Sequence, residues 1–483
     1  MRYYIGIDLG TSGLKGLLVD GRGNILRERS ATYPIAYPQA GWSEQDPADW
    51  LKACKSVLKS LCEGIEAEIA GISFGGQMHG LVLLDKEDKV IRPCILWNDG
   101  RTEKQTAYLN EEVGKEKLSA WTANIAFAGF TAPKILWVKE NEPENFAQIS
   151  KIMLPKDYLA YMLTGVFSTD YSDASGTLLL DVKNKRWSKE MCKLCSVKES
   201  WLPKLYESYE VTGKVKPEYG LAKAVLTAGA GDNAAAAIGT GTVRQGDCNI
   251  SVGTSGTIFI AGDTFAEDTR NALHAFAHAT GKWHLMGCIL SAASARKWWL
   301  EEILSSKDYE TDEAEIAQAE ESGLIFLPYL MGERSPHNDV NAKGCFIGLT
   351  ATMTRAQMSK AVMEGVAFAL RDCLEAAKEN GITPGYTNLC GGGAKSKTWR
   401  QIIADALNLP VHVLETEQGP AYGAAMLAIV GCGEYAGVEE AAAKIVRVRE
   451  EIRPNPIAVK KYDEKYGIYK RLYPALKDLF SKI

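Results

Sequence analysis

The chain has 483 residues, of which 46% are hydrophobic and 24% charged, and its formal net charge is −5. These values are typical of a soluble globular protein of about two to three domains. Lysine and arginine are spread along the chain, which argues against a nucleic-acid partner, and no window approaches the roughly 18 apolar residues of a membrane span. The first residues run into a predicted strand without a secretory leader, and the 11 cysteines are expected to be reduced thiols, so we expect a cytoplasmic protein.

The N-terminus predicts a β-hairpin around a glycine-rich turn. Residues 3–7 and 14–19 read as strands, and a third strand follows the turn at residues 21–24, so an antiparallel meander is expected. Asp8 at the strand end is a candidate for holding Mg²⁺. The turn offers backbone and hydroxyl donors to a phosphate, from Gly10, Thr11 and Ser12. An ordinary β-turn is the other interpretation, and for this stretch alone it is the more common one.

Strands and helices then alternate, as in an α/β layer. We expect a helix over 48–63 and strands over 69–74, 81–84 and 91–97. Two of these strands end in candidate ligand loops, which contain Gln77, Met78 and His79 in the first and Trp97, Asn98 and Asp99 in the second. A single loop histidine is more often structural than functional.

The next segment predicts two helices, over 131–139 and 157–163, and a polar loop over 169–176. A charged and aromatic stretch over 184–213 is expected to be peripheral. It contains one CxxC pair, Cys192 and Cys195, but no second pair at zinc-site spacing, so two faces of a helix are favoured over a metal or redox site.

The chain is organised around a run of small residues, 229–241, which contains one carboxylate, Asp232, followed by Asn233. A buried strand over 223–228 is expected to lead into it and a helix to begin near Ala234. A helix N-terminus lowers a carboxylate pKa, so Asp232 would stay ionised as a general base. An N-cap aspartate is an equally good interpretation of this stretch alone, and the two are compatible.

The pattern strand, Gly-Thr-Ser-Gly, strand recurs over 248–261. Two such hairpins, one at the start of each half, are what a duplicated fold needs to hold a phosphate chain between two lobes. We therefore predict two domains, residues 1–244 and 245–483, and assign the second hairpin's Gly253, Thr254 and Ser255 to phosphate binding.

In the second half we expect helices over 290–304, 354–380 and 460–480, and an irregular loop over 326–337. Thr354 and Gln357 form a capping box at the start of the long helix. A strand ends at a loop that lets a flat ligand lie on bare backbone before a helix N-terminus, made of Gly391, Gly392, Gly393 and Ala394. The small residues at 419–425 are expected to serve helix packing.

No GxxxxGK[ST], HRD, DFG or HExxH motif is present, which excludes P-loop enzymes, protein kinases and HExxH metalloproteases. The motifs IGIDLGTSGLK, WSEQDP, GGQMHG, ILWNDGR, LPKDYL, GDNAAAAIG, SVGTSG, LPYLMGERSPH and GGGAKS occur in this order from residue 5 to 396. In this set the chain resembles the FGGY carbohydrate kinase family, most closely its bacterial members that act on D-xylulose.

The resemblance implies an α/β, two-lobed, actin-like (ribonuclease-H-like) ATPase fold with a central cleft, and transfer of phosphate from ATP, with Mg²⁺, to D-xylulose. It implies that Asp232 is the catalytic base, that Asp8 positions Mg²⁺, and that Met78 and His79 bind sugar beside Asn233. It assigns the two hairpins to the phosphates of ATP and Gly391–Ala394 to its adenosine, and places Trp97, Asn98 and Asp99 on the sugar side. It also suggests a homodimer.

Three alternatives stay open. The substrate could be another polyol, such as D-ribulose, gluconate or glycerol. The chain could be a non-kinase actin-like ATPase, a chaperone or filament protein, or it could be a non-catalytic sugar sensor. The lack of a peptide-binding domain and of a helix-turn-helix argues against the last two.

Overall fold

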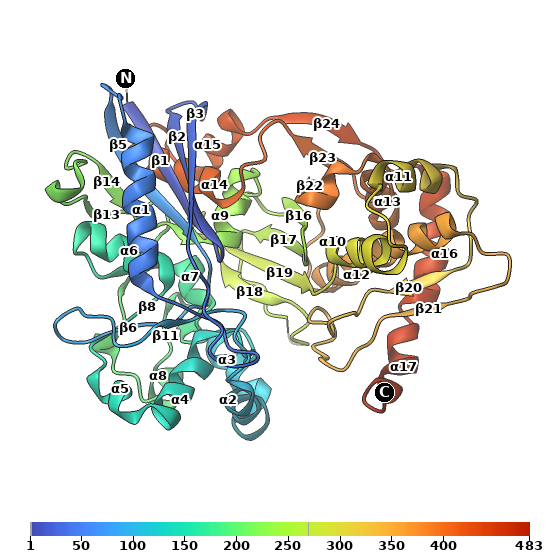
Figure 1. Ribbon diagram of the computed structural model, residues 1–483, viewed down its shortest axis with the longest axis horizontal. Helices are drawn as coiled ribbons and strands as arrows, with labels where there is room; N and C mark the ends of the chain where they lie inside the picture. The colour runs from blue at the N-terminus through green and yellow to red at the C-terminus, as the bar shows by residue number, and fades with distance from the viewer. Residues whose placement is uncertain (1, 269) are drawn as a thin grey trace.

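The computed structural model describes residues 2–268 and 270–483 and consists of two lobes side by side, each built on a seven-stranded sheet (Figure 1). This confirms the predicted two-lobed α/β fold. The first sheet has the order β13-β14-β5-β1-β2-β3, with β15 paired to β5, and the second has the order β18-β19-β17-β16-β22-β23-β24. The bounds in the first sheet are β1 Arg2–Leu9, β2 Gly13–Asp20, β3 Ile25–Thr32, β5 Glu68–Gly76, β13 Val211–Lys214, β14 Val225–Thr227 and β15 Ala230–Gly231. Those in the second are β16 Cys248–Val252, β17 Gly256–Gly262, β18 His274–Ala277, β19 Trp283–Ile289, β22 Thr387–Cys390, β23 Val411–Leu414 and β24 Val448–Ile452.

Helices cover both sheets. The main ones are α1 Pro47–Cys62, α4 Thr131–Asn141, α6 Pro155–Thr164, α7 Tyr171–Ser175, α8 Lys189–Leu194, α9 Asp232–Gly239, α10 Ala293–Lys297, α11 Tyr309–Gln318, α12 Arg355–Glu379, α13 Lys397–Leu407, α14 Gly419–Gly431, α15 Val438–Ile445, α16 Pro456–Tyr469 and α17 Leu472–Phe480. Within the described ranges, no helix is both long enough and apolar enough to cross a bilayer.

The first sheet brings three predicted site segments to one edge. Strands β1 to β3 form the expected antiparallel meander, while β5 runs parallel to β1 and β15 runs parallel to β5. Asp8 is in register with Gly75, and Gly231 with Gly76. Because parallel strands end at the same edge, the first hairpin, the loop after β5 and the start of α9 lie together.

The second sheet repeats this arrangement in the second lobe. β16 and β22 are parallel neighbours, so the second hairpin and the 391–394 loop leave the same edge. Gly391 has φ +88°, and a Cβ there would lie 2.8 Å from the Val252 carbonyl carbon. Only glycine allows this close approach.

The helix α14 joins the two halves. It comes from the second half of the chain but packs against β1 and β5 of the first sheet and against α9. A Cβ on Gly423 would lie 1.7 Å from the Ala235 oxygen, and one on Gly6 would lie 2.0 Å from the Ala421 oxygen. The small residues at 419–425 therefore serve packing, as expected. The division at 244/245 stays a prediction.

Other expectations are confirmed or corrected. The capping box of Thr354 and Gln357 starts the long helix α12. Residues 169–176, predicted as a polar loop, instead form the end of a strand (β9, Ser168–Asp170) and α7, and most of their side chains are buried. The predicted terminal helix over 460–480 is two helices, α16 and α17, whose Tyr466 and Tyr469 pack into the core of the second lobe.

Candidate active site

Asp232 is the first residue of α9, after the N-cap Gly231, at the edge where β1, β5 and β15 end. The backbone N–H of Asn233 donates to Asp232 Oδ1 over 2.7 Å. The pKa of Asp232 is raised to about 6, because burial of the carboxylate outweighs this hydrogen bond. The expected lowering by the helix N-terminus is therefore wrong in direction: desolvation dominates where surrounding atoms exclude water.

Asp8 faces the same space from the end of β1. Burial and the negative charge of Asp232 raise its pKa to about 7, and the nearby Lys15 lowers it. Two enclosed carboxylates with few countercharges suit a divalent cation. The described residues contain no cluster of three or more His, Cys, Asp or Glu that could hold a metal. Mg²⁺ typically binds one or two carboxylates together with substrate phosphates, and Asp8 and Asp232 offer two carboxylates here.

The first hairpin is held by a hydrogen bond within its turn and by two neighbouring side chains. Gly10 N–H donates to the Gly13 carbonyl over 3.0 Å, which closes the turn. Gln45 Nε2 donates to the Thr11 carbonyl over 2.7 Å, and Trp97 Nε1 donates to Thr11 Oγ1 over 2.9 Å. The Ser12 side chain is exposed and unengaged by any described residue. Trp97 thus links the predicted sugar loop to the predicted phosphate turn.

Gln77 has a supporting position. Its backbone N–H donates to the Leu9 carbonyl over 2.8 Å, and its side-chain Nε2 donates to Gln45 Oε1 over 3.1 Å. The residue is only 2% exposed. Gln77 therefore bridges β1 and the hairpin support, while its side-chain Oε1 is buried without a partner among the described residues.

Met78 and His79 lie between the base and an aromatic cluster. The Met78 sulfur is 3.9 Å from Asn233 Nδ2, and His79 stacks on Phe130 with ring centroids 4.6 Å apart. His79 has φ +69°, and its carbonyl accepts from the buried Lys134 Nζ over 3.0 Å. No local sequence pattern points to this lysine, whose ammonium group holds the strained His79 backbone in place.

The protonation of His79 follows from its partner. Its Nδ1 lies 2.7 Å from the Gly176 carbonyl oxygen. Burial lowers the His79 pKa to about 3, so the ring is neutral. A carbonyl only accepts, so the proton is on Nδ1 and Nε2 keeps a lone pair. His79 can accept a hydrogen bond from a sugar hydroxyl.

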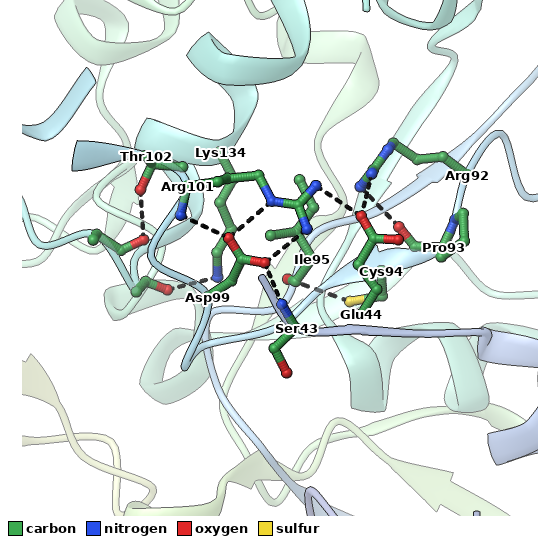
Figure 2. A network of polar contacts seen from close by, with 12 residues as sticks. Ser43, Glu44, Arg92, Pro93, Cys94, Ile95, Asp99, Arg101, Thr102 and Lys134 are labelled. Atoms are coloured by element: carbon green, nitrogen blue, oxygen red, sulfur yellow. Dashed lines mark hydrogen bonds and ion pairs between the residues drawn. The ribbon is translucent and has the colours of Figure 1, made fainter. Parts of the chain in front are cut away.

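The 97–99 loop divides into exposed and sealed residues. Trp97 and Asn98 are exposed, whereas the Asp99 side chain is wholly buried. Asp99 accepts from Arg101 Nε over 2.8 Å and from the Ser43 N–H over 2.6 Å. Figure 2 shows that Arg101 then bridges Asp99 to Glu44, which also contacts Arg92. Asp99 is therefore a structural anchor of this loop, and the expected placement of its carboxylate toward sugar does not agree with the structure.

Backbone hydrogen bonds and a short 3₁₀ turn shape the two glycine-rich loops of the second lobe. The Thr254 carbonyl accepts from Ala292 N–H over 3.0 Å, and the Gly253 carbonyl accepts from Ala293 N–H over 2.7 Å, at the start of α10. Thr254 and Ser255 are left exposed. Gly392 to Lys395 form one 3₁₀ turn before Ser396, the N-cap of α13. The second hairpin and this loop thus leave their polar groups facing outward at one sheet edge.

A buried ionic cluster beneath Asp232 was missed by the sequence analysis. Lys156 Nζ on α6 lies 2.6 Å from Asp157 Oδ1, 2.9 Å from Asp170 Oδ1 and 3.6 Å from Asp173 Oδ2. Asp170 also accepts from Ser172 Oγ over 2.5 Å, and Ser172 Oγ accepts from the Gly231 N–H over 3.1 Å. The cluster therefore connects directly to the N-cap of α9. The motifs around residues 154–159 and 169–176 contained it, but nothing local shows that they meet.

Comparisons with known proteins agree across the whole chain. Residues 3–239 match the model of the N-terminal domain of the FGGY family of carbohydrate kinases, and residues 248–432 match that of its C-terminal domain. The xylulose kinase of Bacillus subtilis is 40% identical over 490 residues, covering 99% of this chain and 98% of the relative. Two solved structures from Lactobacillus acidophilus also superimpose on the structure of this chain. Its ligand-bound xylulose kinase has TM-score 0.95 and 29% identity, with 100% of each chain covered. Its gluconate kinase has TM-score 0.96 and 28% identity, with 100% of this chain and 99% of that chain covered. The chain therefore belongs to the FGGY family of carbohydrate kinases.

Proposed function

We propose that the protein transfers the terminal phosphoryl group of ATP to D-xylulose in the cytoplasm, giving D-xylulose 5-phosphate. The observation that supports D-xylulose as the substrate is an identity of 36–42%, over nearly the full chain, to seven curated xylulose kinases. The solved gluconate and xylulose kinases of Lactobacillus acidophilus are 28% and 29% identical to this chain, so the choice of substrate rests on the curated relatives. A homodimer is part of the proposal, and light scattering in solution measures it.

Asp232 is the proposed general base. It accepts the proton of the attacking sugar hydroxyl as the new O–P bond forms and the bond to the leaving ADP breaks. Asn233 N–H already occupies Oδ1, so Oδ2 is the oxygen free to receive that proton. A base with a pKa of about 6 is ionised at neutral pH.

The surrounding residues orient the two substrates. His79 Nε2 accepts from a sugar hydroxyl, and the Asn233 amide offers donors beside it. The hairpins at 10–12 and 253–255 offer backbone N–H and hydroxyl donors to the phosphates, and Gly391–Ala394 provides the surface for adenosine. Asp8 would hold Mg²⁺, which neutralises phosphate charge when it is bound with ATP.

The test is ADP release with Mg²⁺ and ATP against D-xylulose, D-ribulose, gluconate and glycerol. D-xylulose is expected to give the highest kcat/KM, and Asp232→Ala is expected to abolish transfer while the Kd for ATP stays unchanged. An exposed aspartate, Asp478→Ala, serves as the control. A preference for gluconate would overturn the substrate, and near-normal turnover by Asp232→Ala would remove the base from the mechanism. Release that is independent of sugar would instead support a non-kinase actin-like ATPase.

A further inference from the structure

Arg334 lies in the loop over residues 326–337, which the proposed mechanism does not use. Its backbone is firmly held. The Arg334 N–H donates to Glu333 Oε1 over 2.8 Å, and the same oxygen accepts from the Leu290 N–H over 2.9 Å at the end of β19. On the other side, Ser335 N–H donates to the Cys288 carbonyl over 2.9 Å. The direction in which the Arg334 side chain leaves the backbone is therefore set by the second lobe.

The guanidinium of Arg334 has no hydrogen-bond acceptor among the residues that the structure describes, although the residue is half-buried. This is exceptional in the described part of the chain. All other buried or half-buried arginines there donate to a carboxylate or carbonyl oxygen, namely Arg27, Arg92, Arg101, Arg296, Arg371 and Arg400. A guanidinium carries five N–H donors, and leaving them unpaired in a partly desolvated place is unfavourable. The guanidinium of Arg334 is therefore available to donate to a bound substrate.

The guanidinium reaches across to the first lobe. Its central carbon lies 5.4 Å from the ring centroid of Phe127. Phe127 is 5.3 Å from Phe130, the ring on which His79 stacks. The positive charge of Arg334 also lowers the pKa of His79, in agreement with their proximity. Arg334 therefore borders the proposed sugar site.

A chain of contacts runs from the residues beside the base to the aromatic cluster next to Arg334. Asn233, next to Asp232, contacts Met78, and His79 follows Met78 and faces the aromatic cluster under Arg334. A sugar whose reacting hydroxyl points at Asp232 would thus direct its other end past His79 toward Arg334.

We propose that Arg334 binds the end of the sugar remote from the phosphorylated hydroxyl and recognises there an oxygen that only accepts hydrogen bonds, the C2 carbonyl of an open-chain ketose. This rests on the proposed function. A guanidinium only donates, so it pairs with a carbonyl oxygen without competition from a hydroxyl proton. In an alditol the same position carries a hydroxyl, which must turn its proton away. Arg334 therefore selects ketoses over alditols.

The experiment compares Arg334→Met with wild type on D-xylulose and on xylitol and D-arabinitol, the two alditols that differ from it only in a C2 hydroxyl. Loss of a charged hydrogen bond is expected to lower kcat/KM for D-xylulose about 10- to 100-fold. The ketose-to-alditol ratio of kcat/KM should fall by a similar factor, while the KM for ATP changes less than about two-fold. Arg334→Lys should restore part of the ketose activity. The matched control is Arg449→Met, an exposed arginine on β24, which should change none of these constants.

The outcomes separate this inference from the proposed function. If wild type phosphorylates D-xylulose and Arg334→Met keeps its kcat/KM within about two-fold, or loses activity equally on ketose and alditols, the inference is refuted and the proposed function stands. If wild type instead acts on gluconate, the proposed function fails, and loss of gluconate activity in Arg334→Met would show that the acceptor is a carboxylate rather than a ketose carbonyl. A melting temperature equal to that of wild type confirms that the variant is folded.

Discussion

Replacing Lys156 by methionine should destabilise the first lobe strongly. The ammonium is fully buried and lies within 3.6 Å of three carboxylates that are themselves almost inaccessible, those of Asp157, Asp170 and Asp173. Methionine is similar in length to lysine, so the change removes the charge and leaves little cavity. Breaking a buried ion pair by removing one partner costs about 3–5 kcal/mol. For a lobe of this size about 1 kcal/mol shifts the melting temperature by 2–4 °C, so a decrease of roughly 10 °C is expected.

Differential scanning calorimetry measures this, with the first unfolding transition as the readout because two lobes need not melt together. Lys52→Met, an exposed lysine on α1, is the control and should melt within about 2 °C of wild type. Asp173→Asn in the Lys156→Met background removes one carboxylate charge that no longer has a lysine partner. The melting temperature of the double variant should therefore be higher than the sum of the two single-variant shifts predicts. A Lys156→Met protein that melts like wild type, or a double variant that is simply additive, would refute the view that this cluster is held by mutual charge compensation.

Two further predictions follow from the site and its support. The Asp232 base must be ionised to accept a proton, and its pKa is raised to about 6. At saturating Mg²⁺ and ATP, kcat/KM should therefore fall about ten-fold per pH unit below pH 6 and level off above it. A flat pH profile between about pH 5 and 8 would contradict a base with this pKa. Gly423→Ala places a methyl 1.7 Å from the Ala235 oxygen and should lower the melting temperature by at least about 5 °C, whereas Gly467→Ala in α16, with nothing within 4 Å, should leave it unchanged or raise it.

Much of the fold follows from local patterns. The meander, the two hairpins and the helix α12 were predictable because glycine turns, alternating strands and the Thr354 capping box are encoded in a few neighbouring residues. Placement of Asp232 at the start of a helix was predictable for the same reason. Such features need no knowledge of what packs against them.

The failures share a different cause. Residues 169–176 look like a solvent-exposed loop because they carry two aspartates, yet they are buried, since Lys156 from another helix compensates their charge. The acidity expected for Asp232 was reversed by burial. The family resemblance placed Asp99 on the sugar side, whereas its buried carboxylate accepts from Arg101 and from the Ser43 N–H. Each error depends on contacts or desolvation that a local pattern does not contain.

The path of α14 has a consequence for synthesis on the ribosome. The first sheet is translated by residue 231, but the helix that covers its Gly6 face spans Gly419–Gly431, near the end of the chain. The nascent first half must therefore wait, with apolar surface uncovered, while almost all of the second half is made. Domains that fold as units during translation usually close before the next one begins. This protein instead completes its two lobes nearly together, so a chain truncated before α14 would expose that surface and depend on chaperones or aggregate.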